Sequence, residues 1–342
     1  MTTSFSSLPI VDVGALNNGN EQDLASLSKT LYSVFTTTGF AYLINVPFSF
    51  DHDEIFQLAR DFFGLPLERK MRLAKKSFRS ENDNTYRGYF PTQPLTASDN
   101  LKEGFEIGSP RTQPVVQSSL GSRKINLSEP NVWPNEAEFP SRSRLEQIYD
   151  ELQTFASQLL SLLAVSLGKD RDYFSSWLQY SLSTLRLLHY PIVPQGKLEY
   201  AKGDSEDNSV KLSCTPHTDS GILTLLHQDA TPGLEVLNAS GQWVPAPYVP
   251  GSIIVNIGDL MAKVSGGRFT ATMHRVRSPP PKSTPQADAC SRFSIPFFFE
   301  PGEMCIVRPL NGGGEAVAYG EHVRKKMSTW VEFQDDSGYD TT

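Results

Sequence analysis

Two copies of a metal-binding pattern lie within the segment CTPHTDSGILTLLHQDATPG, residues 214–233: His217 with Asp219, and His227 with Asp229. In a β-strand, residues two apart point to the same side, so either pair could offer an imidazole nitrogen and a carboxylate oxygen to one metal ion. Such a pair also arises by chance, so it is a weak sign of a metal site on its own. Its surroundings and a third ligand must decide between the two copies.

A third ligand is needed because two imidazoles and one carboxylate on one face of a metal leave the opposite positions open for substrate and oxygen. The candidates are His52, His189, His274 and His322. His274 lies in FTATMHRV, a predicted strand 55 residues after Asp219, and a few strands of a β-rich fold fit into that span. His52 and His322 lie in helical or terminal segments. For His189, in LRLLHYP, we expect a packing or supporting role.

The local context favours the first pair. His227 lies inside the apolar stretch ILTLLHQ, and Asp229 begins the turn DATPG, where a short carboxylate normally accepts hydrogen bonds from backbone N–H groups. His217 and Asp219 instead come at the end of a predicted strand, where side chains can enter a cavity. This reasoning ranks the pairs without excluding the second, and zinc hydrolases also use two His and one carboxylate.

The elements that must position these residues can be predicted from the spacing of apolar residues. In the N-terminal part they are, in order, a strand at 8–13, a helix at 24–35, a strand at 40–46, a helix at 51–63 and a short helix at 67–74. Residues 77–142 are rich in Ser, Asn, Pro and Gly, which predicts loops and short strands. This stretch is the best candidate for a lid over a site.

The rest of the chain is predicted to form one long helix followed by short strands. A continuous apolar stripe predicts that helix over 143–167, and about eight short strands bounded by Gly and Pro follow it. Such a run of strands indicates a jelly roll or barrel. The fold class is therefore mainly β with flanking α. We divide the chain into an N-terminal region, 1–142, and a region at 143–342 with the long helix and the β-rich core, and we expect the two to form one compact unit.

Composition limits the possible partners. The 342 residues carry a net charge of -7, and the densest basic runs, 68–76 and 324–326, are too short to follow a phosphate backbone. We therefore expect no nucleic-acid partner. The N-terminus lacks the pattern of a secretory signal, no apolar run is long enough to span a bilayer, and three cysteines without metal-type spacing suit a reducing interior. These features predict a cytoplasmic protein without disulfides.

The order of several motifs resembles one enzyme family. His217-Thr218-Asp219, then His274-Arg275-Val276, then Arg292-Phe293-Ser294 follow the pattern of the iron(II)- and 2-oxoglutarate-dependent dioxygenases of the isopenicillin N synthase-like group. The stretches LPIVDV, KEGFEIG, NVWP, PGLEV and VNIGDL fall in that family's order, so the resemblance covers about residues 8–310. It implies a double-stranded β-helix, or jelly-roll, core with the N-terminal helices packed outside.

The resemblance also implies a cofactor set. Fe(II) would be held by His217, Asp219 and His274, with 2-oxoglutarate and O2 as co-substrates, and His227 would become a core residue. Tyr190 stands where members of the family usually place a tyrosine that hydrogen-bonds 2-oxoglutarate. Two residues earlier, where many relatives have Asn, this chain has Leu188, so that contact is missing or supplied by another group.

Arg292 and Ser294 have a chemical logic of their own. They are two apart on the apolar stretch RFSIPFFFE, so they share one face of a strand. A planar guanidinium beside a hydroxyl suits a terminal carboxylate, and a buried Arg needs a partner anion. In the family this carboxylate is the distal one of 2-oxoglutarate. An isolated Arg-x-Ser would more often lie on a surface strand.

The substrate pocket is harder to predict. Phe298 has the same strand parity as Arg292, so it is a candidate wall of the pocket, with plain core packing as the alternative. Phe105, Ile107 and Arg87, with Tyr89 beside them, are candidates for the entrance.

The reaction expected from the resemblance is oxidation of a C–H bond, by default hydroxylation, with decarboxylation of 2-oxoglutarate to succinate and CO2. Desaturation and ring closure differ only in how the substrate is held, which no motif reports. The substrate is expected to be a small, mainly apolar or phenolic metabolite. The alternatives are an oxidase resembling isopenicillin N synthase, which uses no 2-oxoglutarate, and a non-catalytic small-molecule binder.

Overall fold

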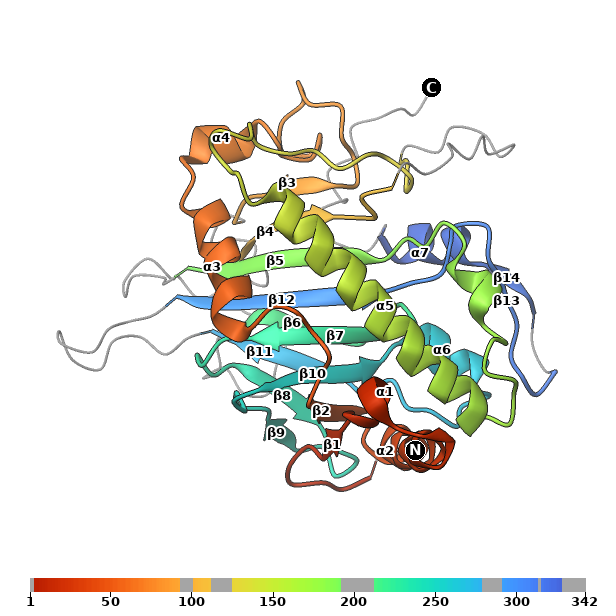
Figure 1. Cartoon of the computed structure of the whole chain (residues 1–342). Helices are drawn as coiled ribbons and strands as arrows, with labels where there is room; N and C mark the ends of the chain where they lie inside the picture. Colours follow the sequence, from red (N-terminus) through yellow and green to blue (C-terminus); the bar gives the residue numbers. More distant parts are fainter. Residues whose placement is uncertain are drawn as a thin grey trace, which may run out of the picture.

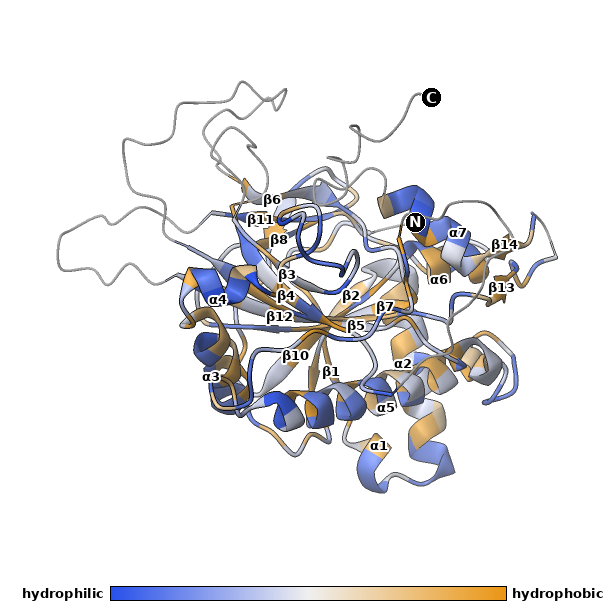
Figure 2. Ribbon diagram, turned by 90° about the horizontal axis from the view of Figure 1, so that it is seen from above, coloured by the Kyte–Doolittle hydropathy of each residue, from blue (hydrophilic) through white to orange (hydrophobic). Residues whose placement is uncertain are grey.

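Two β-sheets face each other at the centre of the molecule, and helices cover the outer face of the larger one (Figures 1 and 2). A computed structural model of the chain describes residues 3–92, 101–111, 125–191, 212–278, 291–312 and 315–327. In Figure 2 the helices α1, α3 and α5 lie on one side of the larger sheet, and strands β6, β8 and β11 lie on the other. This is the predicted jelly-roll core with an N-terminal helical region.

The larger sheet, here the major sheet, has eight strands in the order β1-β2-β10-β7-β12-β5-β4-β3. Its pairs are antiparallel except for β1 with β2. The strands are β1 (Ile10–Asp12), β2 (Phe40–Ile44), β3 (Gly88–Phe90), β4 (Glu103–Ile107), β5 (Thr184–Tyr190), β7 (Leu223–Gln228), β10 (Ser252–Ile257) and β12 (Arg292–Phe299).

The smaller sheet, here the minor sheet, has four strands in the order β6-β11-β8-β9. They are β6 (Leu212–His217), β8 (Leu234–Leu237), β9 (Trp243–Pro245) and β11 (His274–Arg277). A separate hairpin of β13 (Ile306–Val307) and β14 (Val317–Ala318) follows the last strand of the major sheet. This hairpin lies outside the two main sheets.

The predicted helices are present, but the one predicted at 24–35 extends over Glu21–Thr37 and the one predicted at 67–74 ends at Met71. Asn20 and Asp23 form a capping box at the start of α2, and Asp51 caps α3 through the backbone N–H of Glu54. The long helix predicted at 143–167 is confirmed as α5, which buries one continuous face. The helices are α1 (Ala15–Asn18), α2 (Glu21–Thr37), α3 (His52–Phe63), α4 (Leu67–Met71), α5 (Arg142–Ser166), α6 (Asp259–Val264) and α7 (Tyr319–Met327), with a 3-10 turn, η1 (Ser175–Leu178).

The alternation of side chains along the major sheet creates two cores. Leu185 and Leu187 of β5 belong to the larger core, between the sheet and the helices. Leu188 and Tyr190 of the same strand belong to a smaller core between the two sheets, which we call the interior. The parity of a strand residue therefore decides whether it packs against helices or faces the interior.

Strands from the N-terminal region belong to the same major sheet as the later strands. β2 pairs with β10 on one side, and β4 pairs with β5 on the other. The region predicted as loops and short strands thus supplies β3 and β4, while part of the candidate lid lies outside the described residues.

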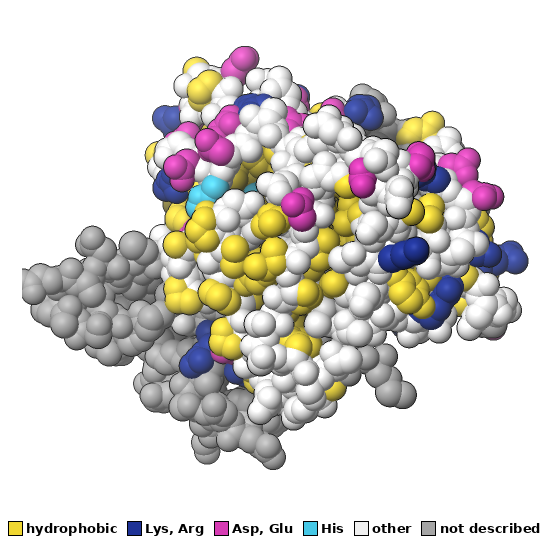
Figure 3. Space-filling model, turned by 60° about the horizontal axis from the view of Figure 1, so that its bottom comes forward, with side chains coloured by type: hydrophobic (Ala, Val, Ile, Leu, Met, Phe, Trp, Pro, Cys, Tyr) yellow, Lys and Arg dark blue, Asp and Glu magenta, His cyan; other side chains and the backbone are white. Residues whose placement is uncertain are grey.

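The outer surface is mixed. The face drawn in Figure 3 carries hydrophobic side chains near its centre and charged side chains nearer its edge. Among the described helices, none is both long and apolar enough to cross a membrane.

Candidate metal centre and co-substrate site

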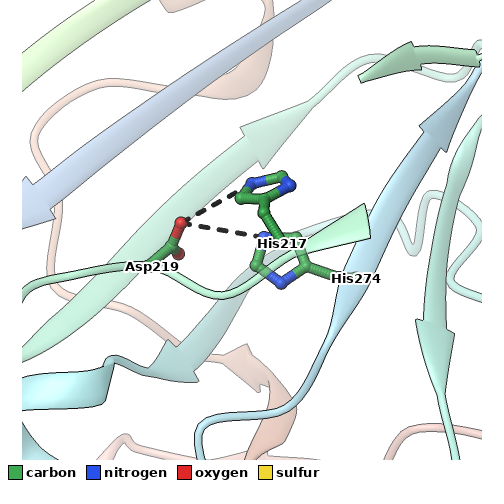
Figure 4. A group of neighbouring side chains, drawn as sticks. All are labelled: His217, Asp219 and His274. Atoms are coloured by element: carbon green, nitrogen blue, oxygen red, sulfur yellow. Dashed lines mark ion pairs between the residues drawn. The ribbon is translucent and has the colours of Figure 1, made fainter. Parts of the chain in front are cut away.

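His217, Asp219 and His274 come together where the ends of two minor-sheet strands meet (Figure 4). His217 ends β6 and His274 begins β11, and the two residues are direct cross-strand partners. Asp219 Oδ1 lies 3.8 Å from His217 Nε2 and 3.7 Å from His274 Nε2. All three potential ligand atoms lie within 4.8 Å of one another. An ion about 2 Å from each ligand atom fits such a group.

Hydrogen bonds orient each of the three side chains. His217 donates from Nδ1 to the Thr215 carbonyl at 2.8 Å, and His274 donates from Nδ1 to the Thr272 carbonyl at 3.2 Å. Because Nδ1 carries the proton, Nε2 of each ring can offer a lone pair to a metal. The tautomer of both rings therefore suits metal binding.

Asp219 is held from the opposite sheet. Its Oδ2 atom accepts hydrogen bonds from Thr224 Oγ1 at 2.6 Å and from Asn256 Nδ2 at 2.8 Å. Thr224 lies near the start of β7, and Asn256 lies near the end of β10. These two hydrogen bonds occupy Oδ2, and the other oxygen, Oδ1, faces the two imidazoles.

The three side chains of the centre differ in their pKa values. Burial lowers the pKa of His274 to about 4, so this imidazole is neutral near pH 7. Burial acts to raise the pKa of Asp219, but the two nearby histidines and the hydrogen bonds from Thr224 and Asn256 outweigh it, and the pKa lies below its usual range. Burial acts to lower the pKa of His217, but Cys214 and Asp219 outweigh it and raise the pKa to about 9, so a metal ion that binds Nε2 of this ring displaces a proton.

Tight backbone packing places Asp219 beside β10. The Asp219 carbonyl accepts a hydrogen bond from the Asp259 backbone N–H at 2.8 Å, where α6 begins. A Cβ atom on Gly258 would lie 2.2 Å from the Gly221 carbonyl oxygen, so no larger residue fits at this crossing. The segment after His217 is thereby fixed against the major sheet.

The second His-x-Asp pair lies elsewhere. His227 is buried on the helix side of β7, with its ring 5.8 Å from Phe48 and 5.5 Å from Phe50. Asp229 accepts hydrogen bonds from the backbone N–H groups of Thr231 at 2.9 Å and Phe293 at 2.6 Å. The predicted core position of His227 and the predicted turn role of Asp229 are both confirmed.

The other histidines also lie away from the centre. His189 Nδ1 is 2.7 Å from Glu103 Oε1, and its ring stacks on Phe293 at 4.6 Å, which confirms its packing role. His52 begins α3, with Nε2 3.3 Å from the Gln228 carbonyl, and His322 lies within α7.

Arg292 is buried with donors that lack partners. Its side chain is 1% exposed, and its Nε and Nη1 atoms make no hydrogen bond to the described part of the chain. The guanidinium carbon lies 4.9 Å from the ring centre of Tyr190, and Ser294 Oγ lies 3.4 Å from the Tyr190 hydroxyl. A buried guanidinium with unsatisfied donors beside two hydroxyls fits the carboxylate of a bound acid. Arg292, Ser294 and Tyr190 thus gather as the sequence suggested.

Leu188 is the cross-strand partner of Ser294 and faces the interior. It supplies an apolar wall at the place where many relatives have Asn. Phe298 lies two positions beyond Pro296 on the same face and is half-buried, whereas Phe297 and Phe299 pack among the helices. Its position between the sheets agrees with the parity argument.

Phe105 and Ile107 require a correction. Both are buried in the core between the major sheet and the helices, and the Phe105 ring stacks on Phe62 of α3 at 4.1 Å. They face away from the interior, so the prediction that they line its entrance is wrong. The error has a simple cause: the strand parity of β4 was not anchored by a residue of known direction.

Arg87 and Tyr89 are structural in this arrangement. Arg87 is 2% exposed and donates hydrogen bonds to Thr184 Oγ1 and, at 3.1 Å, to the Leu182 carbonyl. Tyr89 donates its hydroxyl to Glu103 Oε2 at 2.6 Å. These bonds tie the segment around β3 to β5 and β4. Tyr89 packs in the core on the helix side of the major sheet, whereas a place for Arg87 at the entrance stays a prediction.

Several functional candidates escaped the sequence reasoning. Thr224 and Asn256 orient Asp219: Thr224 carries no motif, and Asn256 lies in the stretch VNIGDL but had been assigned no role. Cys214, which had been assigned no role at the site, has its Sγ 3.7 Å from His217 Nδ1 and 3.5 Å from Lys102 Nζ. Cys214 and Cys305 are free thiols, and Cys290 lies outside the described residues.

Two family models match the chain. The model described as 2OG-Fe(II) oxygenase superfamily matches residues 182–301, and the model described as non-haem dioxygenase in morphine synthesis N-terminal matches residues 8–136. The first match contains all three residues of the candidate metal centre and also Arg292 and Ser294.

Characterised relatives and solved structures agree with this match. The chain is 33% identical to the 2-oxoglutarate-Fe(II) type oxidoreductase hxnY of Emericella nidulans, over 75% of this chain and 68% of that protein. It is 30% identical to the clavatol oxidase claD of Penicillium crustosum, over 94% and 96%. A full-length protein of Neurospora crassa in complex with alpha-KG superposes with a TM-score of 0.76 at 27% identity, covering 94% of this chain and 96% of that one. The same Neurospora protein has also been solved with thymine.

Proposed function

Since the chain belongs to the 2OG-Fe(II) oxygenase superfamily and is an Fe(II)- and 2-oxoglutarate-dependent dioxygenase, we propose that it oxidises a C–H bond of a small metabolite, by default through hydroxylation. The family, the class of enzyme and the cofactors predicted from the sequence are thereby confirmed. The substrate, the outcome of the reaction and the residues that carry it are the proposal.

We assign Fe(II) to His217, Asp219 and His274, and the distal carboxylate of 2-oxoglutarate to Arg292, Ser294 and Tyr190. The observation that carries this assignment is the buried Arg292, whose unsatisfied donors face the same interior as the three metal-ligand candidates. A dicarboxylic co-substrate accounts for both features, since one end can meet the guanidinium and the other the metal.

Bound Fe(II) would supply a positive charge and open coordination positions for a 2-oxo acid and dioxygen. The protein's own part is to position and to shield. Thr224 and Asn256 fix the direction of the Asp219 carboxylate, and Arg292 fixes one end of the co-substrate. Leu188 and Phe298 keep water away from the reacting atoms, so that the oxidant is used on the substrate.

The relatives support a small-molecule substrate. The Neurospora protein has been solved with thymine, and the name of clavatol oxidase refers to another small compound. Fungal relatives with such names support the proposal that this protein acts in secondary metabolism. We infer no identity for the substrate from them, because the residues that select it differ between family members even where the fold does not.

The test is a reconstitution with Fe(II) and 2-oxoglutarate, first without oxygen. We expect a weak visible charge-transfer band from the chelate, and, with oxygen and a substrate, one succinate for each oxidised product. Candidate substrates can be screened by the rate of succinate formation. Oxygen consumption that leaves 2-oxoglutarate intact would instead indicate an oxidase of the isopenicillin N synthase type, and binding without any turnover would indicate a non-catalytic binder.

A further inference from the structure

The acid of the second His-x-Asp pair lies beside the proposed co-substrate residues, although the candidate metal centre does not use it. Asp229 directly follows β7, which pairs with β12 up to Gln228 opposite Ser294. The next position of this register brings Asp229 opposite Phe293, the residue between Arg292 and Ser294. The chain then leaves the major sheet, because the next strand, β8, belongs to the minor sheet.

Asp229 binds both backbone polar groups of Phe293. Its backbone N–H donates to the Phe293 carbonyl at 3.2 Å, and its Oδ2 atom accepts from the Phe293 N–H at 2.6 Å. In a regular antiparallel pair a backbone carbonyl would accept the second bond. The other carboxylate oxygen, Oδ1, accepts from the Thr231 N–H at 2.9 Å, two residues further along the chain. One carboxylate therefore ends the strand pairing and begins the turn.

The turn that Asp229 begins reaches the Arg292 side chain. A Cβ atom on Gly233 would lie 3.5 Å from Arg292 Cδ and 2.9 Å from the Arg277 carbonyl oxygen. The Gly233 carbonyl also accepts the Arg277 N–H at 2.8 Å, which ties this segment to β11 of the minor sheet. The segment 229–233 is thus fixed to one sheet at each end and contacts the aliphatic part of Arg292.

The other side of β12 is held by β5. Arg292 is the cross-strand partner of Tyr190, and Ser294 is that of Leu188. The backbone polar groups of successive strand residues point to opposite sides, so those of Arg292 and Ser294 point to β5 and those of Phe293 point to Asp229. Asp229 is therefore the support of the Arg-x-Ser segment on the side of β7.

The charge of Asp229 would by itself oppose the binding of a second anion at Arg292. Burial raises the pKa of Asp229, and the N–H groups of Phe293 and Thr231 and the nearby Arg292 oppose this rise. Each carboxylate oxygen accepts from a backbone N–H, while Nε and Nη1 of Arg292 have no partner in the described part of the chain. A negative charge near a guanidinium weakens its attraction for a carboxylate. Any benefit of Asp229 to co-substrate binding must therefore come from position.

We propose that Asp229 is a positioning residue for co-substrate binding. By holding the Phe293 backbone, it sets the direction in which Arg292 and Ser294 meet the distal carboxylate of 2-oxoglutarate. Asp229 does not itself contact the co-substrate in this arrangement. The inference rests on the proposed function, because it assigns a support to that same co-substrate site.

The experiment compares two 2-oxo acids on the Fe(II)-loaded protein without oxygen. 2-Oxoglutarate and 2-oxopentanoate have the same carbon chain length, but a methyl group replaces the distal carboxylate in the second compound. Each is titrated through the charge-transfer band, which reports binding at the metal. The ratio of the two Kd values then reports what the distal carboxylate contributes. The variants are Asp229→Ala, which removes both acceptor oxygens, and Asp229→Asn, which keeps one.

Asp12→Ala is the matched control. Asp12 also ends a strand, β1, and its Oδ1 atom also accepts from the backbone N–H two residues further on, that of Gly14, at 2.8 Å. Its Oδ2 atom accepts from Asn45 Nδ2 at 2.9 Å. In the major sheet β1 is separated from β12 by β2, β10 and β7, so the control lies far from the co-substrate residues. Thermal unfolding of each variant checks the fold.

We expect the wild type to bind 2-oxoglutarate on the order of 10-fold or more tightly than 2-oxopentanoate. Asp229→Ala should lose on the order of 10-fold of the affinity for 2-oxoglutarate, with little change for 2-oxopentanoate. Asp229→Asn should keep part of the preference, because its carbonyl oxygen can still accept the Phe293 N–H. Asp12→Ala should bind both compounds as the wild type does. If Asp229→Ala does not fold, a preference of Asp229→Asn below that of the wild type is the expected result.

Tighter binding of 2-oxoglutarate by Asp229→Ala would show that the charge of Asp229 outweighs its positioning, and it would overturn the inference. Equal losses for both 2-oxo acids would also overturn it, as would unchanged preferences in both Asp229 variants or an equal loss of preference in Asp12→Ala. The wild type tests the proposed function separately. If it forms no charge-transfer band, or binds the two compounds equally, the proposed function and its co-substrate assignment fail.

Discussion

Asp219 shows how single residues prepare the candidate metal centre. Its carboxylate has two oxygens with separate tasks: Oδ2 accepts hydrogen bonds from Thr224 and Asn256, and Oδ1 faces the two imidazoles. Residues that orient a ligand in this way affect metal binding nearly as much as the ligands themselves. A sequence pattern identifies the ligand more easily than its support, because the supporting residues come from distant strands.

The substitution Asn256→Ala removes one of the two donors to Oδ2. The carboxylate then rotates more freely, and we expect the affinity for Fe(II) to fall on the order of 10- to 100-fold. Anaerobic titration with Fe(II) measures this. Asn238→Ala is the control, since Asn238 is also buried and hydrogen-bonded but lies at the turn between β8 and β9. Unchanged Fe(II) affinity in Asn256→Ala would show that Thr224 alone orients Asp219.

Arg292→Gln tests the co-substrate assignment. The change removes the positive charge that we assign to the distal carboxylate of 2-oxoglutarate, and a charge-assisted hydrogen bond contributes about 1.5 to 3 kcal/mol. The apparent Kd for 2-oxoglutarate should therefore rise on the order of 10- to 100-fold, while the affinity for Fe(II) alone stays the same. Titration of the charge-transfer band gives both values. Normal binding of 2-oxoglutarate by Arg292→Gln would contradict the assignment of Arg292 to the co-substrate site.

At the scale of elements, parity decides what each strand residue does. The period of apolar residues predicted the helices α2, α3 and α5 well, because each buries one continuous stripe. The faces of short strands were less predictable. Phe298 could be placed because Arg292 and Ser294 fix the direction of β12, whereas β4 is short, carries a glutamate on each face and is buried throughout, so Phe105 gives no direction by itself.

Phe105 offers a test of this correction. Its ring stacks on Phe62 between β4 and α3, so Phe105→Ala should lower the free energy of unfolding by about 3 to 5 kcal/mol. Because the side chain faces away from the interior, the affinity for 2-oxoglutarate should not change in the folded fraction. Urea denaturation and co-substrate titration measure the two effects. If Phe105→Ala were as stable as the wild type but bound 2-oxoglutarate with a different affinity, Phe105 would line the site after all.

His227 links the packing of β7 to pH. Burial, with a smaller contribution from the facing His52, lowers the pKa of His227 to about 3, from about 6.5 in an unfolded chain. Below about pH 6.5 the unfolded chain therefore takes up a proton that the folded chain does not. The free energy of unfolding should fall as the pH falls from about 6.5 toward 3, by at most about 1.4 kcal/mol per pH unit from this residue.

The substitution His227→Leu should remove that contribution. Urea denaturation over this pH range gives the free energy of unfolding of the wild type and of the variant. Other titrating groups contribute equally to both proteins, so the difference between the two curves reports on His227. The wild type should lose stability more steeply than the variant as the pH falls. Parallel curves would mean that His227 is protonated in the folded protein as readily as in the unfolded chain.

At the scale of the whole molecule, the candidate metal centre exists only where the two sheets face each other. The minor sheet carries His217 and His274, and the major sheet carries the residues that hold Asp219. The strand-rich texture and the family resemblance were sufficient to predict this architecture. They could not predict the buried ion pairs of Glu106 with Lys75 and Arg186, because these three residues come from distant segments that meet only when the strands pair.

The central claim is that the first His-x-Asp pair, and not the second, binds Fe(II). The most direct test is anaerobic titration with Fe(II) in the presence of 2-oxoglutarate, followed through the charge-transfer band, in His217→Ala and His227→Ala, with thermal unfolding to confirm that each variant is folded. We expect the band to be absent in His217→Ala and present in His227→Ala. A band that persists in His217→Ala and disappears in a folded His227→Ala would contradict the account.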